Sequence, residues 1–202
     1  MLLVPHGAEE DAVRRAAPHA TVVGIRAGAS AAQLPAALSS GPIVVMGLCG
    51  ALRAVRTGGI VIYRDAVDAL GRYTFDAEQV AALHAHIPEA TVVHACTIDH
   101  VVTRATERAA LSAAYGADVV DMETTHLARA LAAQGRASLV LRIASDDPTF
   151  DLPPIEAAFT PDGKLRPLHL AGAFIARPVA AARFIRDVRH ALNILGRTAA
   201  RL

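Results

Sequence analysis

The chain is poor in cysteine and in aromatic residues. Its 202 residues include two cysteines, Cys49 and Cys96, no tryptophan, and only 4% aromatic residues. Two cysteines in a chain of this length make no disulfide framework, and their spacing matches no metal or redox motif. Alanine, valine and leucine must therefore provide most of the core. The hydrophobic fraction of 53% is large enough for a substantial core, and we expect one domain over residues 1–202.

Long apolar runs and an excess of one charge are missing as well. No apolar run approaches the roughly 18 residues that a membrane-spanning helix needs. The start of the chain lacks the basic segment of a signal peptide, so the predicted location is cytoplasmic. The net charge of +1 gives no support for a nucleic-acid partner. A small molecule is the expected ligand.

Short apolar segments alternate with alanine-rich segments over the first three quarters of the chain. The apolar segments predict strands at Met1–Val4, Ala20–Ile25, Pro42–Met46, Ile60–Tyr63, Thr91–His94 and Ser138–Ala144. The alanine-rich segments predict helices over residues 8–17, 29–39, 76–86, 104–115 and 122–134. This alternation predicts an α/β fold, a single-domain α/β/α sandwich with a mixed central sheet. Ligands of such sheets bind beyond the carboxyl ends of the strands.

The C-terminal quarter differs in composition. Four prolines interrupt residues 151–170, which predicts a loop or lid. Residues 171–198 carry apolar side chains at helical spacing and predict a basic helix, because six arginines stand against one acid, Asp187, between residues 171 and 202. Two interpretations of this helix stay open. It packs on the domain with its arginines in water, or it rests on anionic lipid as a peripheral membrane contact.

Two polar segments lie where a strand passes into a loop or helix. In the first, Gly47 and Gly50 let the backbone turn and let a ligand approach its N–H groups. In the second, Asp121-Met122-Glu123, a carboxylate at a helix start can accept hydrogen bonds from a ribose diol, although acids are favoured there by the helix dipole alone. Glu123 and His126 have the spacing of a helical metal pair, but no second pair accompanies them. No metal or cofactor is predicted.

A third polar segment follows the predicted strand Ser138–Ala144, which delivers Ser145 and Asp146 to its carboxyl end. An aspartate screened from water has a raised pKa, and it can hold a proton for a leaving base. The alternative is structural, because Asp146 can cap a turn at Asp147-Pro148.

Together, the three segments resemble the nucleoside phosphorylase and nucleosidase superfamily. Gly47–Leu52 resembles the family's glycine-rich strand end, Asp121–Glu123 its Met-Glu ribose motif, and Arg142–Asp146 the strand that ends in its Ser-Asp pair. The resemblance covers about residues 1–155. Within the superfamily, the short chain and the basic tail are most similar to the hopanoid-associated phosphorylase group.

The resemblance implies cleavage of the bond between ribose and the base of a 5′-modified adenine nucleoside. The residues that it implies for substrate binding are Gly47, Cys49, Gly50, Met122 and Glu123. Asp146 would protonate N7 of the purine, and Ser145 would position it. An acid near the N-terminus, Glu10 or Asp11, would orient a water molecule or contact the sugar. A homo-oligomer is also expected by resemblance.

The nucleophile is the open point of this prediction. Phosphorolysis, with inorganic phosphate as co-substrate and an adenosylated hopanoid precursor as one candidate substrate, is the first hypothesis. The candidate phosphate ligands are Arg53, Thr97, Thr103 and Arg104. However, Ala51 replaces a common glycine and no early phosphate loop is evident. Hydrolysis, as in 5′-methylthioadenosine/S-adenosylhomocysteine-type nucleosidases, is the alternative, and a non-catalytic nucleoside sensor is the alternative of another class.

Overall fold

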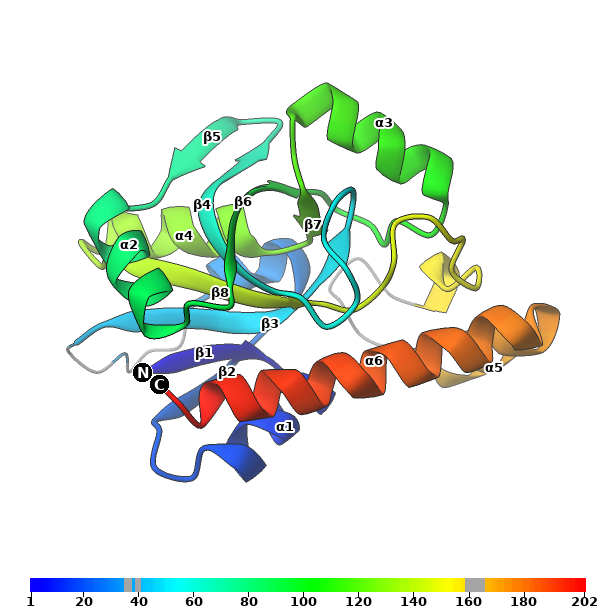
Figure 1. Ribbon diagram of the computed structural model, residues 1–202, viewed down its shortest axis with the longest axis horizontal. Helices are drawn as coiled ribbons and strands as arrows, with labels where there is room; N and C mark the ends of the chain where they lie inside the picture. Colours follow the sequence, from blue (N-terminus) through cyan, green and yellow to red (C-terminus); the bar gives the residue numbers. More distant parts are fainter. Residues whose placement is uncertain (35–37, 39–40, 159–165) are drawn as a thin grey trace.

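The computed structural model describes residues 1–34, 38, 41–158 and 166–202 (Figure 1). In this part of the chain eight strands form one sheet: β1 (Leu2–Pro5), β2 (Val22–Ile25), β3 (Ile43–Ala51), β4 (Ile60–Asp68), β5 (Gly71–Thr74), β6 (Thr91–Thr97), β7 (Val119–Asp121) and β8 (Ser138–Ala144). The α-helices are α1 (Ala8–Ala16), α2 (Ala77–His86), α3 (Ala105–Tyr115), α4 (Thr124–Ala133), α5 (Pro167–Ala176) and α6 (Pro178–Ala199). Two short 3₁₀ helices are η1 (Gly28–Ala32) and η2 (Glu156–Ala158).

The sheet is mixed, and part of it closes on itself. Strand β3 pairs in parallel with β1 and β8 and antiparallel with β7. Strand β8 pairs antiparallel with β4, and β6 joins β4 to β7 through two parallel ladders. Strands β3, β8, β4, β6 and β7 therefore form a continuous ring of paired strands. Strands β1 and β2 extend the sheet from β3, and β5 extends it from β4.

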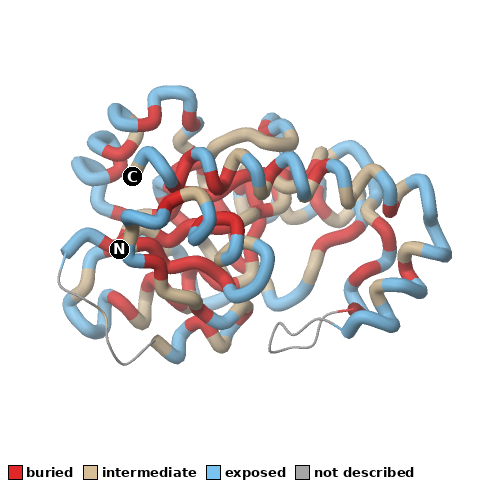
Figure 2. Tube along the Cα trace, turned by 90° about the horizontal axis from the view of Figure 1, so that it is seen from below, coloured by how far each residue is buried: buried red, intermediate tan, exposed pale blue. Residues whose placement is uncertain are grey.

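Helices flank this sheet, so the predicted α/β fold with a mixed central sheet is confirmed. Helix α6 contacts β3 and β8 and packs along α1, whereas α4 contacts β4 and β8 and lies behind the sheet in Figure 1. The central strands are buried on both sides, which explains why β8 is apolar almost throughout. Figure 2 shows the buried residues inside the molecule and the exposed residues on its outside.

Several elements differ from the sequence prediction. Strand β8 has the predicted bounds, but β3 runs on to Ala51 because its end pairs with β7, and β4 runs on to Asp68 because its end pairs with β6 and β5. Strands β5 and β7 were not predicted: β7 has only three residues, and β5 is a largely exposed hairpin partner of β4. Of the helix predicted over 29–39, the structure shows η1. Residues 35–37 and 39–40 lie outside the described residues.

The C-terminal segment is divided differently from the predicted loop over 151–170 and single helix over 171–198. Helix α5 begins within the predicted loop, at Pro167, and a break at Arg177 separates it from α6. Pro178 explains the break, since proline has no N–H to donate and disfavours a helical conformation in the residue before it. The prediction of one helix over 171–198 is therefore wrong. Residues 159–165 of the predicted lid lie outside the described residues.

Helix α6 packs closely on α1 at Gly196. A Cβ atom at this position would lie 3.1 Å from the carbonyl oxygen of Ala12 and 3.1 Å from the Cβ of Ala16. The small residue thus sets the approach of the two helices, and it holds α6 against the sheet.

We expect Gly196→Leu to lower the free energy of unfolding by about 1–3 kcal/mol, because a larger side chain at a close helix contact forces the helices apart. Urea denaturation measures the change. Gly172→Leu is the matched control, because its Cβ would meet no atom within 4 Å. Equal stability of the two variants would contradict this account of the α1–α6 contact.

Candidate active site

A cavity of about 360 Å³ lies at the carboxyl ends of the strands. Its walls come from the segments that follow β1, β2, β6 and β8 and from the last residues of β3 and β7. This is the place that the sequence predicted for a ligand. Its polar lining residues are His6, Glu9, His100, Asp121, Glu123, Ser145 and Asp146. The apolar side comes from the segment around η2 and from α6.

The buried guanidinium of Arg142 organises the polar side. Arg142 lies in the middle of β8 and has no exposed surface. Its Nη1 donates to Oε1 of Glu123 at 2.8 Å and to the Leu48 carbonyl oxygen at 3.3 Å, and its Nη2 donates to Oγ1 of Thr124 at 3.3 Å. A charge buried among apolar strands needs such partners. The ion pair therefore fixes where the Glu123 carboxylate lies.

Gly47 makes room for this charge. A Cβ at Gly47 would lie 2.4 Å from Nη1 of Arg142 and 2.8 Å from Oε1 of Glu9. A side chain here would displace the guanidinium and the carboxylate, so glycine at this position preserves their arrangement. Gly47 does not itself line the cavity, whereas Cys49 and Gly50 do.

Glu9, at the start of α1, is the second carboxylate near Arg142. Its Oε1 accepts a hydrogen bond from the Leu48 N–H at 2.5 Å. Burial is the main cause that raises the pKa of Glu9 to about 7, and the nearby Glu123 carboxylate adds to the effect. Arg142 and the Leu48 N–H act in the opposite direction. A carboxyl group with this pKa can exchange a proton near neutral pH.

The start of α4 positions Glu123 and Met122. Asp121 accepts hydrogen bonds at its Oδ1 from Oγ1 of Thr97 at 2.9 Å and from the Thr124 N–H at 3.1 Å. The bond from Thr124 satisfies an N–H of the first turn of the helix, and the bond from Thr97 holds Asp121 against β6. Both Met122 and Glu123 line the cavity. Burial raises the pKa of Glu123, while Arg142 opposes the shift.

Asp146 follows β8 and is also nearly buried. It accepts hydrogen bonds from the Ala51 N–H at 2.9 Å and from Nη2 of Arg108 at 2.9 Å. Arg108 comes from α3, is buried, and also donates to the carbonyl oxygens of Val102 and Asp147. Burial raises the pKa of Asp146, and Arg108 is the main opposing influence. Asp146 is thus held in place by a second buried ion pair.

Ser145 and Cys49 support the same edge of the cavity. The Ser145 hydroxyl donates to the Cys49 carbonyl oxygen at 3.1 Å, and the Ser145 N–H donates to the same oxygen at 2.9 Å. Burial raises the pKa of the Cys49 thiol, so this cysteine is neutral and unsuited to act as a nucleophile.

The structure brings six of the predicted site residues together at the cavity: Cys49, Gly50, Met122, Glu123, Ser145 and Asp146. Glu10 and Asp11 are not among its lining residues. Glu10 instead binds His6 and Arg14, and Asp11 is exposed. The acid that reaches the cavity from α1 is Glu9.

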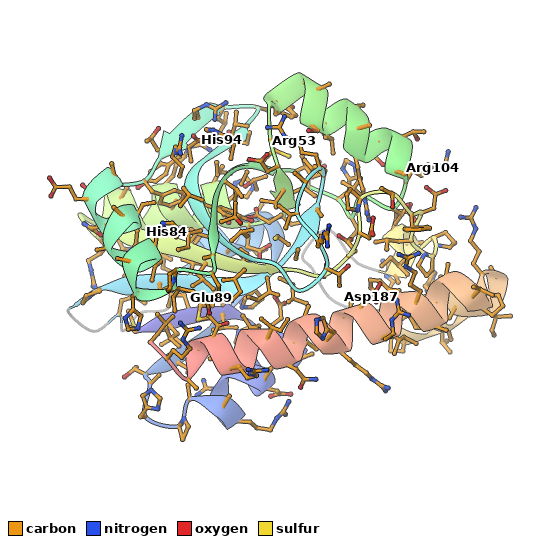
Figure 3. The ribbon with its side chains drawn as sticks, in the orientation of Figure 1. Arg53, His84, Glu89, His94, Arg104 and Asp187 are labelled. Carbon is orange, nitrogen blue, oxygen red and sulfur yellow. The ribbon has the colours of Figure 1, made fainter. Side chains whose placement is uncertain are left out.

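The candidate phosphate ligands also lie outside the cavity lining. Arg53 binds Asp118 and the Gly116 carbonyl oxygen at one end of α3, and Arg104 is exposed at the other end (Figure 3). Thr97 is buried against Asp121, and Thr103 donates to Glu156. No arginine or lysine among the described residues lines the cavity.

Sequence reasoning missed the roles of Glu9, Arg108 and Arg142. Helical phase would have selected Glu9, because it lies three and four positions before Ala12 and Val13, the buried residues of α1. A single charge inside the apolar strand Ser138–Ala144 is the signal for Arg142. Arg108 had no such signal, because arginine is common on exposed helix faces.

We expect Arg142→Met to lower the free energy of unfolding by about 3–5 kcal/mol, because it leaves the Glu123 carboxylate buried without its cation. Urea denaturation measures the loss. Arg53→Met is the control: its ion pair with Asp118 is about half exposed at the arginine, and such pairs contribute about 0–1 kcal/mol. Losses of similar size in both variants would contradict a central role for Arg142.

The fold has known counterparts, although the sequence has no match among family models or curated proteins. The 5′-methylthioadenosine/S-adenosylhomocysteine nucleosidase of Neisseria meningitidis, in complex with methylthio-immucillin-A, has a TM-score of 0.67 at 12% identity, covering 100% of this chain and 98% of that one. The Streptococcus pneumoniae nucleosidase with 8-aminoadenine has a TM-score of 0.61 at 16% identity, covering 96% and 97%.

A further counterpart is a futalosine hydrolase mutant of Helicobacter pylori. Its TM-score is 0.64 at 11% identity, with 93% of this chain and 96% of that chain covered. The chain therefore has the fold of these nucleosidases along almost its whole length.

Proposed function

We propose that the protein hydrolyses the N-glycosidic bond of a purine nucleoside. The observation that carries the proposal is a cavity with four carboxylates, Glu9, Asp121, Glu123 and Asp146, and no arginine or lysine from the described residues. Apart from the imidazoles of His6 and His100, this lining offers inorganic phosphate no cationic side chain, and its carboxylates suit an oxocarbenium-like sugar and a water nucleophile. The shared fold of the nucleosidases supports the same reaction class.

In the proposed reaction, the C1′–N9 bond breaks and its electron pair moves to the purine. Asp146 donates a proton to N7, so the base leaves as a neutral molecule. Its raised pKa supports this role. Glu123 accepts hydrogen bonds from the ribose hydroxyls, and Met122 packs against the sugar. Arg142 holds Glu123 in place through the bond to Oε1.

Glu9 is the proposed general base. It takes a proton from the water molecule while the water oxygen bonds to C1′. A carboxyl group with a pKa of about 7 is ionised in half of the molecules at neutral pH, and it is a stronger base than an exposed glutamate. Because Glu123 and Glu9 share Arg142, the sugar-binding carboxylate and the base belong to one network.

The apolar side of the cavity supports an apolar 5′ substituent. Leu152, Ile155, Phe184, Val188 and Leu192 line it, and none of them can hydrogen-bond a sugar through its side chain. With the purine and ribose on the polar side, this wall is left for the 5′ group. The narrower hypothesis of an adenosylated hopanoid precursor rests on this wall and on the resemblance in sequence.

The first test is release of free adenine from adenosine, 5′-methylthioadenosine and 5′-alkyl adenosines, each with and without phosphate. We expect release without phosphate and a free sugar as product. The kcat/KM should rise with alkyl length, because each buried methylene contributes about 0.8 kcal/mol, or roughly fourfold. Phosphate-dependent release of a sugar 1-phosphate would make the protein a phosphorylase, and binding without release would make it a sensor.

The role of Glu9 is tested by its pH dependence. We expect kcat/KM of the wild type to fall as the pH drops through about 7, because protonated Glu9 cannot accept a proton. Glu9→Gln should reduce kcat by about 10²–10⁴-fold and abolish this acid limb. Glu10→Gln is the control and should keep the wild-type rate and profile. If Glu10→Gln loses activity while Glu9→Gln keeps it, the assignment of the base is wrong.

A further inference from the structure

Helix α5 is apolar on all sides. Its sequence, Pro167 to Ala176, contains a single polar side chain, His169. One face packs inward, where Ala173, Phe174 and Leu170 contact Ile155 and Ala158 of the η2 segment. A helix that is apolar all round is normally buried on all sides. The outer face of α5 is therefore the feature that needs a partner.

This outer face is strongly exposed. Leu168, Ala171, Gly172 and Ile175 have the spacing of one helix face, and Val179 follows at the start of α6. Leu168, Ile175 and Val179 are 86%, 80% and 84% exposed, and they are three of the five exposed large hydrophobic residues in the described part of the chain. Figure 1 shows α5 at one end of the molecule, away from the sheet.

The charged side chains within the segment that forms this face are all of one sign. Residues 166–186 contain four arginines, at positions 166, 177, 183 and 186, and no acid. Arg166 and Arg177 lie at the two ends of α5 and are exposed. Nearby acids come from other segments: Asp151 lies 3.7 Å from Arg177, and Asp187 binds Arg186. Arg183 contacts the Phe150 ring and Asp147 and thus faces the domain.

We propose that this surface, defined by Leu168, Ile175 and Val179 with Arg166 and Arg177, docks on an anionic lipid bilayer. Apolar side chains between exposed arginines are the pattern of helices that lie in a membrane interface, where the arginines reach the headgroups. No helix of the described residues is long and apolar enough to cross a membrane, so the contact is peripheral.

A second copy of the chain is a poorer occupant. A two-fold contact through α5 presents the same patch on both subunits. It would bring Arg166 and Arg177 of one copy close to those of the other in a dry interface, where like charges repel strongly. An anionic surface pairs with the same arginines instead.

The lipid contact thus differs from the one that the sequence suggested. Helix α6 is largely occupied by the domain: Ala181, Ala191, Leu195 and Ala199 are buried, and Arg183 is engaged by acids and by Phe150. The docking surface lies mainly on α5 and on the first turn of α6. It does not depend on the proposed reaction.

The test is sedimentation of the full chain with vesicles of phosphatidylglycerol and phosphatidylcholine, and with phosphatidylcholine vesicles alone. We expect binding to the anionic vesicles that weakens with salt. The triple variant Leu168→Gln/Ile175→Gln/Val179→Gln should lose about tenfold or more in partitioning. Leu70→Gln, at an 81% exposed position on the β4–β5 turn, is the matched control and should bind as the wild type does.

Light scattering and circular dichroism of the same proteins complete the test. The three substituted side chains are exposed, so we expect unchanged spectra and melting. Arg166→Gln/Arg177→Gln should remove most of the salt-sensitive part of the binding. The proposal is wrong if the wild type stays in the supernatant with anionic vesicles, or if the triple variant binds as well as Leu70→Gln. It is also wrong if the triple variant only converts a dimer to a monomer.

Discussion

The buried charge of Arg142 is the constraint on which the site depends. A guanidinium in the middle of a buried strand is stable only with carboxylates and carbonyl oxygens around it. Glu123 supplies one carboxylate from the β7–α4 junction, and Glu9 approaches from α1. Gly47 keeps the space between them open. The Arg142 charge on β8 thus connects α1 and the β7–α4 junction to one site.

The same arrangement gives the carboxylates different protonation behaviour. Glu123 forms an ion pair with Arg142 at 2.8 Å. The Arg142 charge near Glu9 is therefore already shared with Glu123, and the Glu123 carboxylate also lies close to Glu9. Burial then keeps its proton to about pH 7. Asp146 forms a separate ion pair with Arg108. Pairs of acids in distinct surroundings are how proteins separate a general acid from a general base.

The sequence allowed the fold class, the position of the cavity and six of its lining residues to be predicted. Strand periodicity located β8, and the ends of β7 and β8 held Met122, Glu123, Ser145 and Asp146. The ring of strands closes through β7, a strand of three residues that pairs with β3 and β6. No local sequence pattern predicts such a long-range pairing. Choosing Glu9 over its neighbouring acids required the helical phase of α1. The role of Arg108 could be recognised only from its tertiary contact with Asp146. Pro178 indicated a break in the helix, but the apolar spacing across this position suggested one helix.

The pKa of Glu9 is the most direct test of this account. The carboxyl ¹³C resonance of Glu9, assigned by its loss in Glu9→Gln, can be followed by NMR over a pH titration. Burial beside Glu123 predicts a midpoint near 7. A midpoint near 4.5, the ordinary value for glutamate, would mean that Glu9 is solvated and independent of the Arg142 network, and the proposed base and its site would both be contradicted.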